Sequence, residues 1–171
     1  MQPTTQSQAE RRPTVAVEYS PNEPMPLRGY AALLGIWTAG VTTFVALYAD
    51  RLPRRIAWGD FVLMSIATHK LARIVTKDWV TSPLRAPFVR YQKSIGGGEV
   101  EEKARGEGFR RAVGDLVTCN WCIAPWIAAA LGAGFVLSPR ITRFVSTLFG
   151  AVAISDVLQH LYAAEKKLSR A

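Results

Sequence analysis

Residues 29–49 read GYAALLGIWTAGVTTFVALYA, twenty-one consecutive positions without a formal charge. At 1.5 Å of rise per residue, a helix of this length spans about 31 Å, close to the roughly 30 Å thickness of a bilayer's hydrocarbon core. The stretch therefore predicts a membrane-spanning helix. It is too long for the core of a secretory signal peptide, so we expect it to stay in the protein as an anchor.

Three further apolar stretches follow, at 56–75, 116–137 and 144–164. The first is the least regular, because it carries Asp60 near one end and Lys70 and Arg73 near the other. Those side chains can reach toward lipid headgroups, so the stretch is expected to span the membrane. The alternative to a spanning helix is a half-buried helix in the interface. The stretch at 116–137 is rich in Ala and Gly, which favour close helix packing. The pattern predicts an all-α fold, an integral membrane four-helix bundle.

The polar segments complete the domain plan of the 171-residue chain. Residues 1–26 contain five prolines among polar residues and keep no apolar period, so we expect a disordered tail. Residues 27–171 form one membrane domain, in which residues 76–115 are a long loop between the second and third spans. Although the net charge is +8, no nucleic-acid motif is present, and we expect no nucleic-acid partner.

The distribution of Lys and Arg predicts the orientation. With the tail, the 76–115 loop and the C-terminus on one side, that side holds fourteen basic residues against five on the other. Because cytoplasmic loops collect Lys and Arg, both termini should be cytoplasmic. We therefore expect a multi-pass protein of a bacterial inner (cytoplasmic) membrane.

The 76–115 loop shows two short amphipathic repeats. Leu84, Phe88 and Tyr91 share one face of a helix, and a second repeat runs from Phe109 to Leu116. We expect two short helices lying on the headgroup layer. The glycines at 96–98 indicate a flexible break between them, because no phosphate-binding loop pattern is present. The acidic residues at 99, 101 and 102 are expected to form a solvated run.

Several motifs, taken in order, resemble a known bacterial family. They are T-x-K-x-x-R-x-x-x-x-D-x-V-T-x-P-L-R-A-P-F from Thr68 to Phe88, G-E-V-E-E from Gly98, R-G-x-G-x-R from Arg105, and T-C-x-x-C-x-x-x-W from Thr118 to Trp126. Together they resemble the thirteen-sixty domain-of-unknown-function family of small integral membrane proteins, over roughly residues 60–130. The resemblance implies no reaction or ligand, although one Bacillus member is called a sporulation protein. The loop residues singled out by the motifs are Pro83, Leu84, Arg85, Pro87, Phe88, Gly98 and Glu99.

The two cysteines, Cys119 and Cys122, allow three interpretations. A thiol redox pair would favour a thioredoxin-like context, which is absent. A structural zinc site needs two more ligands, and the chain's only histidines, His69 and His160, are expected at a similar depth in the membrane. The third interpretation is helix packing by two small thiols. Zinc is the one cofactor that this pattern suggests.

Asp156 is predicted to lie deep in the fourth span, where an ionisable group normally finds a partner inside the bundle. Lys70 and Arg73 are the expected partners. The pair would be either a static link between helices or part of an ion or proton path.

No catalytic serine, carboxylate pair or dinucleotide fingerprint is present, so we expect a protein that is not an enzyme. The first hypothesis is an accessory or scaffold protein acting through its basic cytoplasmic loop, in envelope or sporulation biology. Its partners would be the lipid bilayer and another membrane or cytoplasmic protein, or a second copy of the chain. The alternatives are a small pore, transporter or holin-like protein, and a membrane-bound metal or thiol protein.

Overall fold

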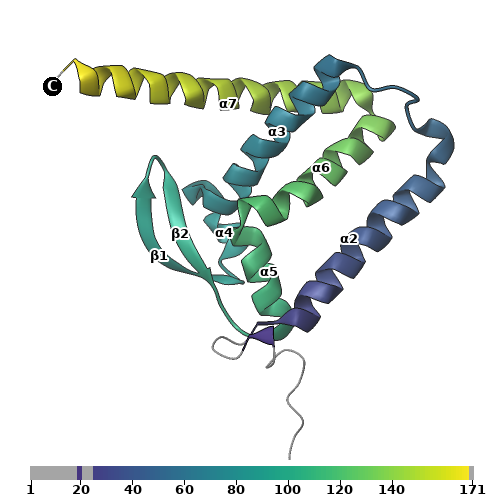
Figure 1. The fold of residues 1–171 in the computed structure, drawn as a ribbon, viewed down its shortest axis with the longest axis horizontal. Helices are drawn as coiled ribbons and strands as arrows, with labels where there is room; N and C mark the ends of the chain where they lie inside the picture. Colours follow the sequence, from purple (N-terminus) through teal and green to yellow (C-terminus); the bar gives the residue numbers. More distant parts are fainter. Residues whose placement is uncertain (1–18, 21–24, 170–171) are drawn as a thin grey trace, which may run out of the picture.

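The computed structural model describes residues 19–20 and 25–169, and Figure 1 shows their arrangement. Most of the predicted tail, residues 1–26, lies outside the described residues. The helices are α2 (Leu27–Leu47), α3 (Trp58–Lys77), α4 (Ser82–Arg85), α5 (Gly108–Thr118), α6 (Asn120–Leu137) and α7 (Pro139–Leu168), with short 3-10 turns η1 (Ala49–Arg51) and η2 (Trp79–Thr81). The strands are β1 (Val89–Gly96) and β2 (Glu99–Ala104).

Three of these helices are long and apolar enough to cross a membrane: α2, α6 and α7. They correspond to the first, third and fourth predicted spans. The second predicted span, 56–75, does form a helix, α3, but this helix is not among the three. Its charged residues at 60, 70, 73 and 77 lower its hydropathy. Apolar helices thus support membrane association, with α3 as a more polar helix between them.

The helices do not form a closed four-helix bundle. α3 packs against both α6 and α7, and α6 also touches α7. α2 packs mainly on α5 and makes a smaller contact with α6, where Trp37 Nε1 donates a 3.3 Å hydrogen bond to the Pro125 carbonyl. Its contact with α5 is close because Gly29 is buried there: a Cβ at Gly29 would lie 2.7 Å from the Cβ of Ala112. Tyr30 Oη also donates a hydrogen bond of 2.8 Å to Asp115 Oδ2.

The predicted third span, 116–137, is divided in two. The chain leaves the helical conformation at Cys119, so α5 ends at Thr118 and α6 begins at Asn120. The Cys119 sulfur accepts a 3.2 Å hydrogen bond from the Cys122 backbone N–H, as an N-cap side chain does. The continuous apolar pattern gave no sign of this break.

Only one of the two interfacial helices predicted for the 76–115 loop forms. α5 forms over the second repeat, but the first repeat contains only the four-residue helix α4 before strand β1 begins. β1 and β2 pair antiparallel, so the fold is mostly helical rather than all-α. Gly96, Gly97 and Gly98 all have positive φ, between 61° and 88°, and form the hairpin turn instead of a flexible break.

The helical part has two ends, one beside the hairpin and one held by an ion pair between α3 and α7 (Figure 1). The N-terminal end of α2, the C-terminal end of α3 and the N-terminal end of α6 lie near the hairpin and α5 (Figure 1). At the opposite end, Arg143 of α7 makes two hydrogen bonds to the Asp60 carboxylate of α3, at 2.7 and 2.8 Å. This pair joins the first turn of α3 to the start of α7.

Candidate functional site: the Arg85 cluster and the adjoining cleft

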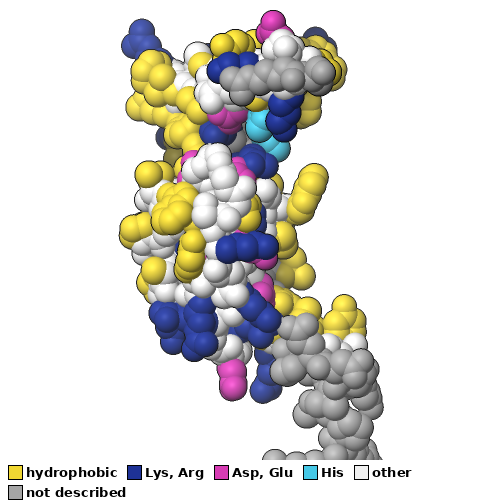
Figure 2. Space-filling view, turned by 90° about the vertical axis from the view of Figure 1, so that its left-hand side faces the viewer, with side chains coloured by type: hydrophobic (Ala, Val, Ile, Leu, Met, Phe, Trp, Pro, Cys, Tyr) yellow, Lys and Arg dark blue, Asp and Glu magenta, His cyan; other side chains and the backbone are white. Residues whose placement is uncertain are grey.

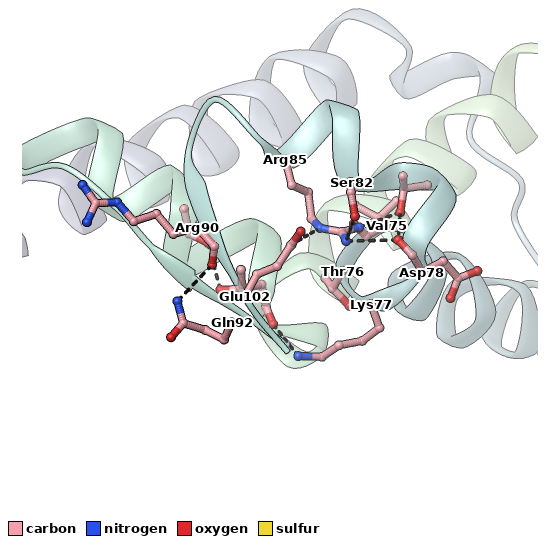
Figure 3. A network of polar contacts seen from close by, with 12 residues as sticks. Val75, Thr76, Lys77, Asp78, Ser82, Arg85, Arg90, Gln92 and Glu102 are labelled. Atoms are coloured by element: carbon pink, nitrogen blue, oxygen red, sulfur yellow. Dashed lines mark hydrogen bonds and ion pairs between the residues drawn. The ribbon is translucent and has the colours of Figure 1, made fainter. Parts of the chain in front are cut away.

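Arg85 is the largest fully buried side chain among the described residues, and it organises the end of α3. Its Nη1 donates to the Val75 carbonyl at 2.7 Å and its Nη2 to the Asp78 carbonyl at 3.0 Å. Its Nε donates to Glu102 Oε2 at 2.5 Å. We call Arg85, Glu102 and these two carbonyls the Arg85 cluster (Figure 3). The guanidinium caps the unpaired carbonyls at the C-terminus of α3 and joins them to β2.

The Arg85–Glu102 pair is buried on both sides, with side chains only 2% and 5% exposed. A buried ion pair is tolerated when its remaining hydrogen-bonding groups are satisfied. Here the hydroxyls of Thr81 and Ser82 accept two more bonds from the same guanidinium, at 2.5 and 3.2 Å. The expected solvated acidic run is therefore wrong at Glu102.

The other loop-motif residues shape the chain around this cluster. Pro83 lies in the first turn of α4, and the Pro87 carbonyl accepts hydrogen bonds from the side chains of Arg105 and Arg110. The Phe88 carbonyl accepts from the Arg105 N–H at 2.9 Å. Leu84 is exposed. The motif thus builds a rigid turn and leaves one large apolar side chain on its surface.

The tip of the hairpin is tied back to α3 and η2. The Gly98 carbonyl accepts a 3.0 Å hydrogen bond from the Trp79 N–H. Glu99, next along the chain, forms an ion pair with Arg73 of α3. The hairpin turn is therefore fixed beside the polar face of α3.

An open cleft of about 1340 Å³ lies between α3, α7 and the hairpin turn. In Figure 2 the hollow separates α7, above, from the hairpin, below, and a histidine side chain lies at its rim. Its charged and polar lining includes the predicted ion-pair residues and both histidines. These residues are His69, Lys70, Arg73, Glu99, Asp156, Gln159 and His160.

Asp156 forms an ion pair with Lys70, one of its two predicted partners. Arg73, the other, pairs with Glu99 instead. Lys70 Nζ lies 2.7 Å from Asp156 Oδ2, and the side chains are 12% and 39% exposed, respectively. The amine is thus mostly covered by the packing of α3 on α7, while the carboxylate faces the cleft. An ion pair this open to solvent stabilises the fold by no more than about 1 kcal/mol.

The structure does not gather the four predicted metal ligands. Cys119 and Cys122 are joined in a disulfide at the α5–α6 junction. His69 and His160 line the cleft, and neither cysteine does. Within residues 19–20 and 25–169, no three His, Cys, Asp or Glu side chains are grouped to hold a metal ion.

Two contacts that the sequence did not predict connect α3 to the cysteine segment. Lys77 Nζ donates a 3.1 Å hydrogen bond to the Thr118 carbonyl, and Thr76 Oγ1 bonds to Asn120 Oδ1. Thr76 is buried, and both residues lie in the last turn of α3. The position of the α5–α6 junction is therefore fixed by the same helix end that binds Arg85.

Comparison with known proteins places most of this architecture in one family. The model of a family described as a protein of unknown function (DUF1360) matches residues 63–162. In Bacillus subtilis (strain 168), the UPF0713 protein YngL is 29% identical over 107 residues, covering 60% of this chain and 79% of the relative. The sporulation protein YjcA of the same organism is 28% identical over 103 residues, covering 58% and 87%. No solved structure matches the chain.

Proposed function

From the premise that this chain belongs to the DUF1360 family of proteins of unknown function, we propose that it is a non-enzymatic accessory or scaffold protein of a bacterial inner membrane. Its partner would be another membrane or cytoplasmic protein, or a second copy of the chain. The contact would be made by residues 78–104, which comprise η2, α4 and the hairpin. We call these residues the hairpin module.

The Arg85 cluster is the observation that supports this proposal. It holds the module on α3 through a buried ion pair in which all three guanidinium nitrogens donate hydrogen bonds. A preformed surface loses little conformational entropy when a partner binds. On the outside of the module lie large exposed apolar side chains, those of Trp79, Val80, Leu84, Tyr91 and Ile95. Apolar and aromatic residues grouped on a surface are typical of binding sites.

The proposed orientation has the hairpin module and both termini in the cytoplasm, with α2, α6 and α7 as spans. It is supported by the excess of Lys and Arg at this end. α3, which contacts α6 and α7, would be the fourth span and return the chain to the cytoplasm. A role in sporulation is suggested by the name of the relative YjcA alone.

Crosslinking with the full-length protein in membranes tests the scaffold function. The test variant is Val80→Ser with Leu84→Ser, the two most exposed of the module's apolar side chains. The matched control is Leu168→Ser, which removes an equally exposed leucine at the end of α7. Loss of a crosslinked partner or dimer in the test variant alone supports the proposal. An unchanged crosslinking pattern in both variants contradicts it.

The cleft favours a second candidate function, a small pore or transporter. Its support is the ion pair of Lys70 with Asp156, whose carboxylate is open to the cleft. Proteoliposomes containing the wild-type chain would then pass ions or protons, and Asp156→Asn would reduce that flux. Equal, background-level flux in both samples leaves the ion pair with a structural role only.

A further inference from the structure

We propose that Cys119 and Cys122 form a redox-active site that exchanges electrons with low-molecular-weight thiols at the membrane surface. This activity goes beyond the scaffold function. Its first support is placement: the two cysteines bracket the first turn of α6, with Cys119 as the N-cap and Cys122 three residues later. One helical turn brings the two sulfurs together, and they are joined in a disulfide.

The two sulfurs are not equivalent. Cys122 is exposed, whereas Cys119 is half-buried in the junction between α5 and α6. A thiol arriving from solution can therefore reach the Cys122 sulfur more easily. The Cys119 sulfur accepts the hydrogen bond from the Cys122 N–H and lies at the positive end of an eighteen-residue helix. When the disulfide breaks, the helix end stabilises negative charge on Cys119.

These positions define the course of the reaction. A thiolate attacks the Cys122 sulfur, the sulfur–sulfur bond breaks, and its electron pair leaves on Cys119. Cys122 is then held in a mixed disulfide with the incoming thiol. A second thiolate attacks the outer sulfur of that mixed disulfide and releases the Cys122 thiolate. Two thiols are oxidised to one disulfide, the protein disulfide is reduced to two thiols, and the protons of the thiols end on the cysteines.

The surroundings of the pair suit an exposed exchange site. Trp121, between the cysteines, is 89% exposed and offers an aromatic surface beside Cys122. Thr76 and Lys77 hold the flanking residues Asn120 and Thr118 on the end of α3. The junction is thus anchored independently of the disulfide, so that the fold can persist when the disulfide is reduced.

The redox state expected for this pair depends on its compartment, and here it rests on the cytoplasmic orientation proposed above. Cytoplasmic thiols are kept reduced, and disulfides that form there are usually transient and functional. A static structural disulfide would be expected only if this end of the protein faced the outside. Redox activity and orientation can be measured separately.

The redox test uses the full-length protein in detergent micelles, equilibrated with defined ratios of reduced to oxidised glutathione. The thiols are then trapped with a maleimide that adds mass, and circular dichroism follows the helix content. We expect a reversible change of two thiols per chain with unchanged helicity. A pair that stays oxidised until the chain unfolds, or that stays reduced at every ratio, overturns the proposal. So does a reduced pair that takes up one zinc ion per chain.

Single-cysteine variants test the proposed course. Treated with oxidised glutathione, Cys119→Ser and Cys122→Ser should each accumulate a stable mixed disulfide in most chains. The reduced wild-type protein should not, because the neighbouring thiol resolves it. Equal accumulation in all three proteins contradicts exchange between the two sulfurs. In a separate experiment, intact cells are treated with a membrane-impermeant maleimide. Labelling of the reduced cysteines would refute the orientation and leave the redox result unchanged.

Discussion

The guanidinium Nε of Arg85 lies 2.5 Å from the Glu102 carboxylate, and the two side chains are almost completely buried. They come from different elements, Arg85 from α4 and Glu102 from β2. The pair is therefore a buried junction between the hairpin and the helical part. Removing either partner leaves the other charge without compensation.

We expect Glu102→Ala to destabilise the chain by about 3–5 kcal/mol, because it strands the buried guanidinium. Glu102→Gln should be milder, since the amide oxygen still accepts a hydrogen bond. Thermal unfolding in detergent measures both. The control is Glu101→Ala, whose partner Lys93 is exposed, and its expected cost is below about 1 kcal/mol. Equal losses for residues 101 and 102 would contradict the assigned role.

Gly114 of α5 lies against the base of the hairpin. A Cβ there would fall 2.6 Å from the Phe88 carbonyl oxygen and 2.8 Å from the Ala104 Cβ. Gly114→Ala should therefore separate α5 from β2 and cost about 1–3 kcal/mol by overpacking. Gly132→Ala in α6 is the control, because nothing lies within 4 Å of its added Cβ. A variant at 114 as stable as the one at 132 would show that α5 adjusts freely.

Asp156→Asn should be less destabilising than Asp156→Leu. The amide oxygen can still accept a hydrogen bond from Lys70, which lies 2.7 Å from the native carboxylate. The leucine leaves a mostly covered ammonium without a partner. Melting temperatures in detergent compare the two, and Ser155→Leu, one residue away, is the control for an added apolar side chain on α7. Equal melting temperatures for the asparagine and leucine variants would mean that water replaces the carboxylate.

Reporter fusions test the orientation. Fusions after residue 97 in the hairpin turn and at residue 171 should both report the cytoplasm, and a fusion after residue 52, between α2 and α3, should report the opposite side. The third site depends on α3 returning across the membrane. A cytoplasmic signal there would mean that α3 lies in the interface and does not cross the membrane. α2 would then be the only crossing before the hairpin, and the N-terminus would lie on the opposite side.

The apolar helices could be predicted from the sequence because length and uncharged composition depend only on neighbouring residues. α7 contains its predicted stretch, and α2 and α6 cover most of theirs. The family resemblance, drawn from motifs between Thr68 and Trp126, is also confirmed by the match over residues 63–162. The break at Cys119 could not be seen, because it follows from hydrogen bonds between α3 and the junction, which join residues about forty positions apart.

The hairpin was missed for a different reason. Leu84, Phe88 and Tyr91 match a helical period, but the strand residues after Phe88 alternate only weakly in polarity, and β1 is exposed along most of its length. The signal that could have corrected the error was the run of three glycines, which permits a left-handed turn between two strands. The burial of Glu102 had no local signal, because its partner Arg85 lies on another element.

The length of α7 has a geometric effect on the cleft. Thirty helical residues extend about 45 Å, well beyond the roughly 30 Å of hydrocarbon that a perpendicular helix needs. The excess consists of charged ends, with Arg140 and Arg143 at the start and Lys166 and Lys167 at the finish, and α7 crosses α3 obliquely (Figure 1). Its C-terminal half lies over the hairpin turn, and the open cleft lies between them (Figure 2). A ligand could therefore enter the cleft from the side, without any separation of α3 from α7.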